Sequence, residues 1–306
     1  MSRRNPLLTS ALLVGLPLWL AVSAGIGLWL HFKKEKEREL AQESRFARAV
    51  SIPSLKDDLT KFVEIIGERH ASTESAASNL SRAASMIEGL LGSSNMGYTV
   101  NRLRGPANWP MLHVTLPGSD PSSPPVWVLA AYDSRPGSKG ADLNASGLAA
   151  TLATAQAMAN SKNPSPVHFL FIPHTHDPDS PVIETIQLAR QSIAKQGPPH
   201  SVLCVETMGS GERLWLTSRD TEAKSLPLIQ GLGEVVGAEV ACLADDTDLA
   251  SLLFETGLPT ARVATGPIPP ADAKDDRTPF APTVAASTGR LLELVQRCAG
   301  THSSRN

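Results

Sequence analysis

Hydrophobic residues recur along the 306-residue chain in two patterns, one helical and one extended. Apolar side chains between Leu80 and Leu91 repeat at helical spacing, which predicts a helix that ends near Gly92. Leu148, Leu152 and their neighbours to Ala159 predict a second, amphipathic helix. Short apolar runs predict four strands: Val126–Ala131, His168–Ile172, Val202–Glu206 and Arg213–Thr217. This alternation predicts an α/β domain with a largely parallel sheet.

The N-terminal region follows a different pattern. Leu7 to Leu30 contains no charged residue, and as a helix it would be roughly 36 Å long, more than the hydrocarbon core of about 30 Å. We therefore predict a tail over residues 1–6 and one transmembrane helix over 7–30. A cleaved signal peptide, cut after Val22-Ser23-Ala24, is the alternative, but the apolar run continues past that point.

Charged residues follow the predicted span. We expect a charged helical stalk over 31–50, an α/β domain over 51–300 and a tail over 301–306. Lys33 and further basic residues up to Arg48 outnumber Arg3 and Arg4, which precede the span. The positive-inside rule thus favours a cytoplasmic domain. Acidic residues are interleaved with the basic ones, so the localisation is predicted as single-pass membrane with the side left open.

Composition excludes some classes of function. The chain has 28 basic and 30 acidic residues and a formal net charge of -2, so no overall positive field would attract nucleic acid. We therefore expect no nucleic-acid partner. The chain also has three cysteines, Cys204, Cys242 and Cys298, which are too few and too scattered for a disulfide framework or a CxxC metal site.

Open α/β sheets place their functional sites at the carboxyl ends of the strands. In this chain three such ends carry polar residues: Tyr132–Gly147, Pro173–Asp177 and Glu206–Gly209. The first contains Asp133, a glycine-rich loop and Asn144-Ala145-Ser146-Gly147, in which a polar side chain can cap the following helix. We expect the site of this domain at these ends.

Six short motifs, in this order and spacing, carry a family resemblance. They are Ile66-Gly67-Glu68-Arg69, Gly97-Tyr98-Thr99-Val100, Leu116-Pro117-Gly118, Ala131-Tyr132-Asp133-Ser134, Gly140-Ala141-Asp142-Leu143-Asn144-Ala145-Ser146-Gly147 and Gly257-Leu258-Pro259. Together they resemble the zinc aminopeptidases and carboxypeptidases of metallopeptidase family twenty-eight, which also contains glutaminyl cyclases and non-enzymatic receptors. The resemblance implies a three-layer α/β/α fold with a mostly parallel, mixed central sheet.

The resemblance also implies five ligands around two zinc ions, which activate a bridging water beside a carboxylate base. The first histidine of the family falls at Ala131 and the bridging aspartate at Leu143. The acidic pair that supplies the base and a ligand falls at about Thr175 and its neighbour, and the last histidine near Ala250. Of the ligand positions, only the one at Glu206 retains a carboxylate. The resemblance therefore implies a degenerate metal centre.

Two further interpretations of the remaining polar residues stay open. His174, His176, Asp177 and Glu206, with Asp133 nearby, are donors from which a mononuclear metal site is geometrically conceivable. Alternatively the histidines are solvated loop residues and Glu206 pairs with an arginine or lysine. Carboxylates in tight turns commonly accept backbone N–H groups two residues on, which is the structural interpretation of Asp133 and of Asp142.

The sequence as a whole thus predicts a membrane-anchored, zinc-aminopeptidase-like domain that is not catalytic and has a binding or scaffolding role. Its expected partners are the membrane, through the N-terminal helix, and a peptide or protein. No cofactor is expected in this case. The alternatives are an active zinc-dependent exopeptidase and a mononuclear metal hydrolase that uses His174 and His176, and both would bind zinc.

Overall fold

The computed structural model describes residues 25, 27–34, 50–159, 161–175, 182–218, 239–242, 248–270 and 272–300. The chain divides into two compact units, Met1–Phe46 and Ala47–Asn306. In the first unit, residues 25 and 27–34 are helical and exposed. Among the helices of the described residues, none has both the length and the apolarity that a membrane crossing requires. Most of the predicted span 7–30 and stalk 31–50, and both predicted tails, lie outside the described residues.

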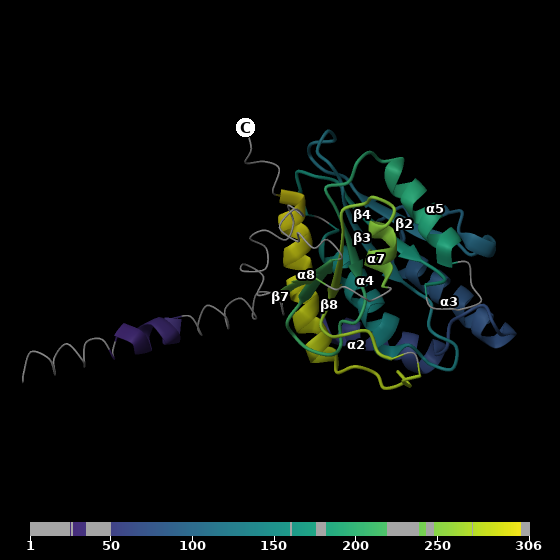
Figure 1. Ribbon diagram of the computed structural model, residues 1–306, viewed down its shortest axis with the longest axis horizontal. Helices are drawn as coiled ribbons and strands as arrows, with labels where there is room; N and C mark the ends of the chain where they lie inside the picture. The colour runs from purple at the N-terminus through teal and green to yellow at the C-terminus, as the bar shows by residue number, and fades with distance from the viewer. Residues whose placement is uncertain are drawn as a thin grey trace, which may run out of the picture. The chain divides into compact units, whose positions relative to one another are not determined.

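The second unit is built on an eight-stranded mixed sheet with the strand order β1-β2-β4-β3-β5-β8-β6-β7 (Figure 1). The strands are β1 Asn101–Leu103, β2 Met111–Leu116, β3 Val126–Ala131, β4 Val167–Ile172, β5 Ser201–Val205, β6 Trp215–Ser218, β7 Glu239–Cys242 and β8 Thr260–Ala264. The four central strands β4, β3, β5 and β8 run parallel. β1 pairs antiparallel with β2, β2 with β4, and β6 with β8. The predicted mixed sheet is confirmed.

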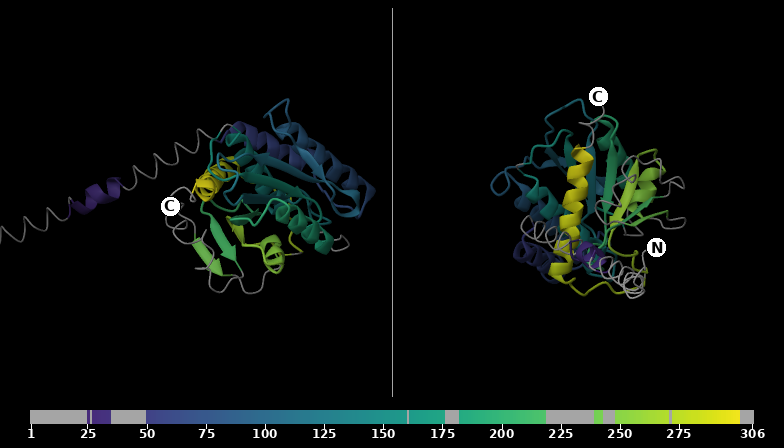
Figure 2. Two further views of the ribbon diagram at one scale, coloured as in Figure 1. Left: turned by 90° about the horizontal axis from the view of Figure 1, so that it is seen from above. Right: turned by 90° about the vertical axis from the view of Figure 1, so that its left-hand side faces the viewer.

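Helices cover both faces of this sheet (Figure 2). The helical segments are α2 Ile52–Thr60, η1 Lys61–Ile66, α3 Glu74–Leu91, η2 Pro106–Asn108, η3 Ala141–Ser146, α4 Gly147–Ala157, α5 Val182–Ala194, α7 Leu249–Phe254 and α8 Ala281–Gly300. One hydrophobic cluster joins α2, α3, α4 and α8 to the sheet, and a second joins α5 and α7 to its other face. Alternate residues of β3 enter the two clusters, since Val128 belongs to the first and Leu129 to the second. The three-layer prediction is confirmed.

The two helices predicted from apolar spacing are present as α3 and α4. The side chain of Thr73 caps α3 by accepting a hydrogen bond from the Ala76 N–H at 3.3 Å. The prediction that α4 is amphipathic is wrong, because α4 is buried almost all round between the sheet and other helices. Thr151 and Thr154 tolerate this burial, since their hydroxyls donate to the carbonyls of Gly147 and Ala150, each at 2.8 Å.

Gly147 lets α4 begin directly against the segment that follows β5. A Cβ at this position would lie 2.0 Å from the carbonyl oxygen of Glu206, which is backbone and cannot move aside cheaply. We predict that Gly147→Ala lowers the free energy of unfolding by about 1–3 kcal/mol or more. Urea denaturation followed by circular dichroism measures this change.

Gly89→Ala is the matched control. Gly89 lies within α3, and a Cβ there would meet nothing within 4 Å. We expect this variant to gain about 0.5–1 kcal/mol, because alanine favours a helix interior over glycine. An equal effect of the two substitutions would contradict the close approach at Gly147.

The buried carboxyl of Asp58 makes the free energy of unfolding depend on pH. It lies on the buried side of α2 with an exposed fraction of 4%, and burial raises the pKa of its carboxyl from 3.8 to about 6, with Lys61 partly opposing the shift. The folded state therefore binds the proton more tightly, so stability falls as pH rises from about 4 to 6. Asp58→Asn should raise the free energy of unfolding by about 1–3 kcal/mol at pH 7. Urea titrations at several pH values should show this gain fading towards pH 4; a gain of the same size at pH 4 and 7 would contradict the burial effect.

Candidate functional site

The carboxyl ends of β4, β3 and β5 lie side by side. Ala131 at the end of β3 pairs with Ile172 at the end of β4, and Ala130 pairs with Val205 at the end of β5. The segments that follow these strands therefore emerge at the same edge of the sheet. This is the edge at which the sequence predicts the site.

Asp133 links the ends of β3 and β4. Its side chain is fully buried, and its carboxylate accepts a hydrogen bond from the Thr175 N–H at 2.6 Å and another from the Thr175 hydroxyl at 2.8 Å. The side-chain amide of Asn144 donates to the same carboxylate at 3.3 Å. Asp133 therefore binds backbone as its structural interpretation predicts, but the N–H belongs to the neighbouring strand end and not to a residue two positions on.

Asp142 has the same kind of role between η3 and the segment that follows β5. Its carboxylate accepts hydrogen bonds from the Ser146 hydroxyl at 2.6 Å and from the Gly209 N–H at 2.7 Å. The Ser210 hydroxyl donates to its second oxygen. The carboxylate is thus occupied by three donors from two segments.

Glu206 forms a buried ion pair with Arg262. Both side chains are 2% exposed, and the Arg262 Nε–H donates to the Glu206 carboxylate. The other carboxylate oxygen accepts the Leu249 N–H at 3.3 Å, and the Arg262 guanidinium also donates to the Thr207 hydroxyl at 3.0 Å and to the Gly266 carbonyl at 3.0 Å. The predicted alternative, that Glu206 pairs with a basic residue, is confirmed.

The sequence contains one signal for this partner. Arg262 is the charged residue of β8, which is otherwise uncharged, and β8 lies next to β5 with Cys204 opposite Arg262. The negative charge of Glu206 also reaches Asp248, whose pKa is raised mainly by burial and further by this charge. Asp248 caps α7, because its carboxylate accepts the Ser251 N–H at 2.6 Å.

Arg69 holds the glycine-rich loop to the segment that follows η1. It is fully buried, and its guanidinium donates to the carbonyls of Tyr132 at 3.1 Å, Phe62 at 2.9 Å and Lys139 at 2.9 Å. Burial lowers its pKa to about 10, although the charges of Asp133 and Asp275 oppose this shift. Arg69 therefore links backbone segments that are remote from one another in sequence.

Asp275 supports the start of η3 from the loop before α8. Its carboxylate accepts the N–H groups of Asp142 at 2.8 Å and Leu143 at 2.7 Å. Burial raises its pKa, and the two backbone hydrogen bonds oppose this shift. The motif around residue 142 is thus held by hydrogen bonds that need no metal ion. Sequence reasoning missed Asp275, because it lies in a polar loop more than a hundred residues further along the chain.

The positions assigned to former ligands have unsuitable side chains. Ala131 ends β3, Leu143 lies in η3 and Ala250 lies in α7, and all three are buried. Thr175 directs its hydroxyl to Asp133. The assignment of these four positions as ligand positions stays a prediction. Their side chains in this arrangement do not fit a zinc ion, because three are aliphatic and the fourth offers only a hydroxyl that is already hydrogen-bonded.

His174 is buried beside Trp109. His174 follows β4 in a left-handed conformation with φ of 56°, and its fully buried ring meets Trp109 edge-on at a centroid distance of 5.9 Å. It is therefore not a solvated loop residue. His176 and Asp177 lie outside the described residues. Within the described part of the chain, no three or more His, Cys, Asp or Glu side chains come together in a group that could hold a metal ion, so His174, Asp133 and Glu206 do not form one.

Comparison with known families agrees with this architecture. The sequence model of peptidase family M28 matches residues 112–173, from β2 to the end of β4. The resemblance to this family is confirmed. None of the curated proteins matches the chain.

Solved structures with a similar fold include aminopeptidases and a glutaminyl cyclase. The LapA aminopeptidase of Legionella pneumophila is 14% identical with a TM-score of 0.66, over 85% of this chain and 74% of LapA. A leucine aminopeptidase precursor from Bacteroides thetaiotaomicron is 13% identical with a TM-score of 0.63, over 81% of this chain and 97% of its own. The Macrostomum lignano glutaminyl cyclase is 13% identical with a TM-score of 0.62, over 84% and 92% of the two chains. At these identities the likeness shows the fold.

The ion pair between Glu206 and Arg262 makes a stability prediction. Arg262→Met removes the cation and leaves the Glu206 carboxylate buried without it, which should cost about 3–5 kcal/mol. The double variant Glu206→Gln and Arg262→Met removes both charges and should recover more than half of that loss. Urea denaturation of the parent, the single variant and the double variant measures these differences. A double variant as unstable as the single one would show that the lost packing of Arg262, and not the uncompensated charge, sets the cost.

Proposed function

We propose that this protein is a membrane-anchored domain with the M28 peptidase fold that has lost catalysis and acts by binding a peptide or protein. The observation that carries the proposal is the state of the three carboxylates at the strand ends. Glu206 is neutralised by Arg262, whereas Asp133 and Asp142 accept hydrogen bonds from backbone N–H groups and hydroxyls. A carboxylate in such a role is not available to a metal ion without rearrangement of the fold around it.

The chemistry of peptide hydrolysis supports the same conclusion. Water must be activated at neutral pH, which paired divalent metals and an adjacent carboxylate base achieve together. Here Ala131 and Leu143 present aliphatic side chains beside Asp133 and Asp142. A guanidinium next to Glu206 supplies the positive charge that a bound metal would otherwise supply, but it cannot bind and ionise a water molecule.

Membrane anchoring is the second part of the proposal. It rests on the uncharged stretch from Leu7 to Leu30, which is long enough to cross a bilayer as a helix. Anchoring would hold the binding domain at a membrane surface.

Zinc content and hydrolysis test the loss of catalysis. The full chain, purified in detergent without chelators and supplied with zinc, should contain far less than one zinc per chain by elemental analysis. It should not release free amino acids from aminoacyl substrates above the rate of buffer. The LapA aminopeptidase is the positive control for hydrolysis, and the Zn-dependent exopeptidase of Parabacteroides distasonis is the positive control for metal loading.

Near-stoichiometric zinc would overturn the proposal. If His174→Ala and His176→Ala then abolished zinc binding, the protein would be a mononuclear metal hydrolase. If zinc persisted in both variants and aminoacyl substrates were cleaved, the protein would be an active exopeptidase whose ligands differ from the positions assigned above. The parent and the variants should first be compared by thermal unfolding, so that lost zinc is not confused with a lost fold.

A further inference from the structure

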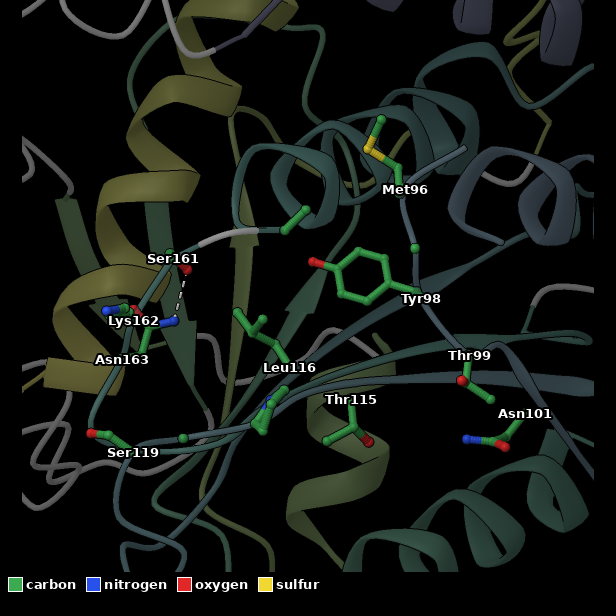
Figure 3. Close-up of a pocket in the computed structure, with 14 residues that line it drawn as sticks. Met96, Tyr98, Thr99, Asn101, Thr115, Leu116, Ser119, Ser161, Lys162 and Asn163 are labelled. Carbon is green, nitrogen blue, oxygen red and sulfur yellow. Dashed lines mark hydrogen bonds between the residues drawn. The ribbon is translucent and has the colours of Figure 1, made fainter. Parts of the chain in front are cut away.

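A groove of about 580 Å³ lies beside β1 and β2, away from the strand ends just described (Figure 3). It is lined by residues 96–99, 101, 115–119, 159 and 161–163. Leu116, which ends β2, pairs with Val167 at the start of β4. The groove is therefore at the edge of the sheet opposite to Asp133 and Glu206, which follow the ends of the parallel strands.

The groove exists because the pairing of β1 with β2 stops early. The ladder ends with Asn101 opposite His113, and its continuation would place Thr99 opposite Thr115. Instead, the chain before β1 is drawn to the end of α3, where the Tyr98 N–H donates to the Leu91 carbonyl at 3.3 Å. Pro117 provides no N–H on the opposite side. The chain before β1 and the chain after β2 thus diverge and leave a space between them.

The floor of the groove is held rigidly. The Tyr98 hydroxyl donates to the Ala155 carbonyl at 2.7 Å, and the Asn163 side chain donates to the Ser161 hydroxyl at 2.9 Å. The Ser119 N–H donates to the Asn163 carbonyl at 2.8 Å. Between these segments Gly118 leaves no space for a side chain, because a Cβ there would lie 2.4 Å from the Pro164 carbonyl oxygen. The groove is therefore preformed, as binding sites usually are.

The lining favours a polar ligand with a negative charge. Lys162 is the charged side chain among the lining residues, which otherwise contribute hydroxyl, amide, backbone and a few apolar groups such as Met96 and Leu116. Diverging extended segments can offer an added strand the backbone partners that a sheet edge offers. The volume also falls within the usual range for small-ligand sites of about 300–1,000 Å³.

We infer that this groove binds a short extended peptide segment that carries a carboxylate, with Lys162 as the partner of that carboxylate. The inference rests on the proposed function in one respect, that the domain acts by binding a peptide. It adds the place of binding and the chemistry of the ligand. It also separates that place from the remnant of the metal centre.

Pull-down from defined peptide pools tests the inference. The probes are two pools of biotinylated hexapeptides, randomised at all but the last position. One pool ends in aspartate with a free carboxyl terminus, and the other ends in asparagine with a terminal amide. The full chain in detergent should retain the acidic pool in preference to the amide pool. Lys162→Glu should lower retention of the acidic pool by about fivefold, because it removes an exposed ion pair and adds repulsion.

Lys56→Glu is the matched control, since it makes the same charge change at an exposed position of α2. It should leave retention unchanged, and both variants should unfold at the temperature of the parent. A benzophenone at the peptide N-terminus should cross-link to residues 96–101, 115–119 or 161–163. Equal retention of the two pools, unchanged retention by Lys162→Glu, or cross-links confined to other residues would overturn the inference. Zinc content and hydrolysis, measured on the same preparation, report on the proposed function independently of these outcomes.

Discussion

Two opposite charges, on Glu206 after the end of β5 and on Arg262 within β8, are buried together, and each depends on the other to remain there. Removing a charge from water costs several kcal/mol, and only a close counter-charge with further hydrogen bonds offsets this cost. The guanidinium meets the condition by also binding Thr207 and Gly266. In this way a residue of the chain provides the positive charge beside the Glu206 carboxylate, which follows the end of β5. The charge of the Glu206 carboxylate is therefore balanced within the protein.

The surrounding frame explains how the turns that follow β3 and β5 keep their shape. Arg69 fixes the loop after β3 through backbone carbonyls, and Asp275 fixes the start of η3 through backbone N–H groups. Asp133 and Asp142 join neighbouring segments through hydroxyls and N–H groups. These interactions depend on the course of the backbone and not on an ion. The shape of these turns therefore depends on packing and on hydrogen bonds within the protein.

The sheet topology separates two regions with different chemistry. Parallel strands bring the turns that contain Asp133 and Glu206 to one edge, where both carboxylates are buried and hydrogen-bonded within the protein. The antiparallel strand β2 ends at the opposite edge, where its ladder with β1 is incomplete and polar groups line an open groove. Binding energy for a partner is thus available at the second edge, while the first contributes to the stability of the fold.

The sequence alone determined the elements and the edge at which polar residues gather. Strand β3 and helix α3 follow from local spacing, and the turn motifs follow from glycine and asparagine positions, because these signals act over a few residues. It also showed that Ala131 and Leu143 carry no donor atoms.

Tertiary structure alone decided the partners of the remaining carboxylates. Arg262 reaches Glu206 across 56 residues, Asp275 reaches the start of η3 from the loop before α8, and α4 is buried almost all round by the sheet and other helices. Such pairings depend on which strands and loops become neighbours, and periodicity within one segment contains no information about the segment packed against it.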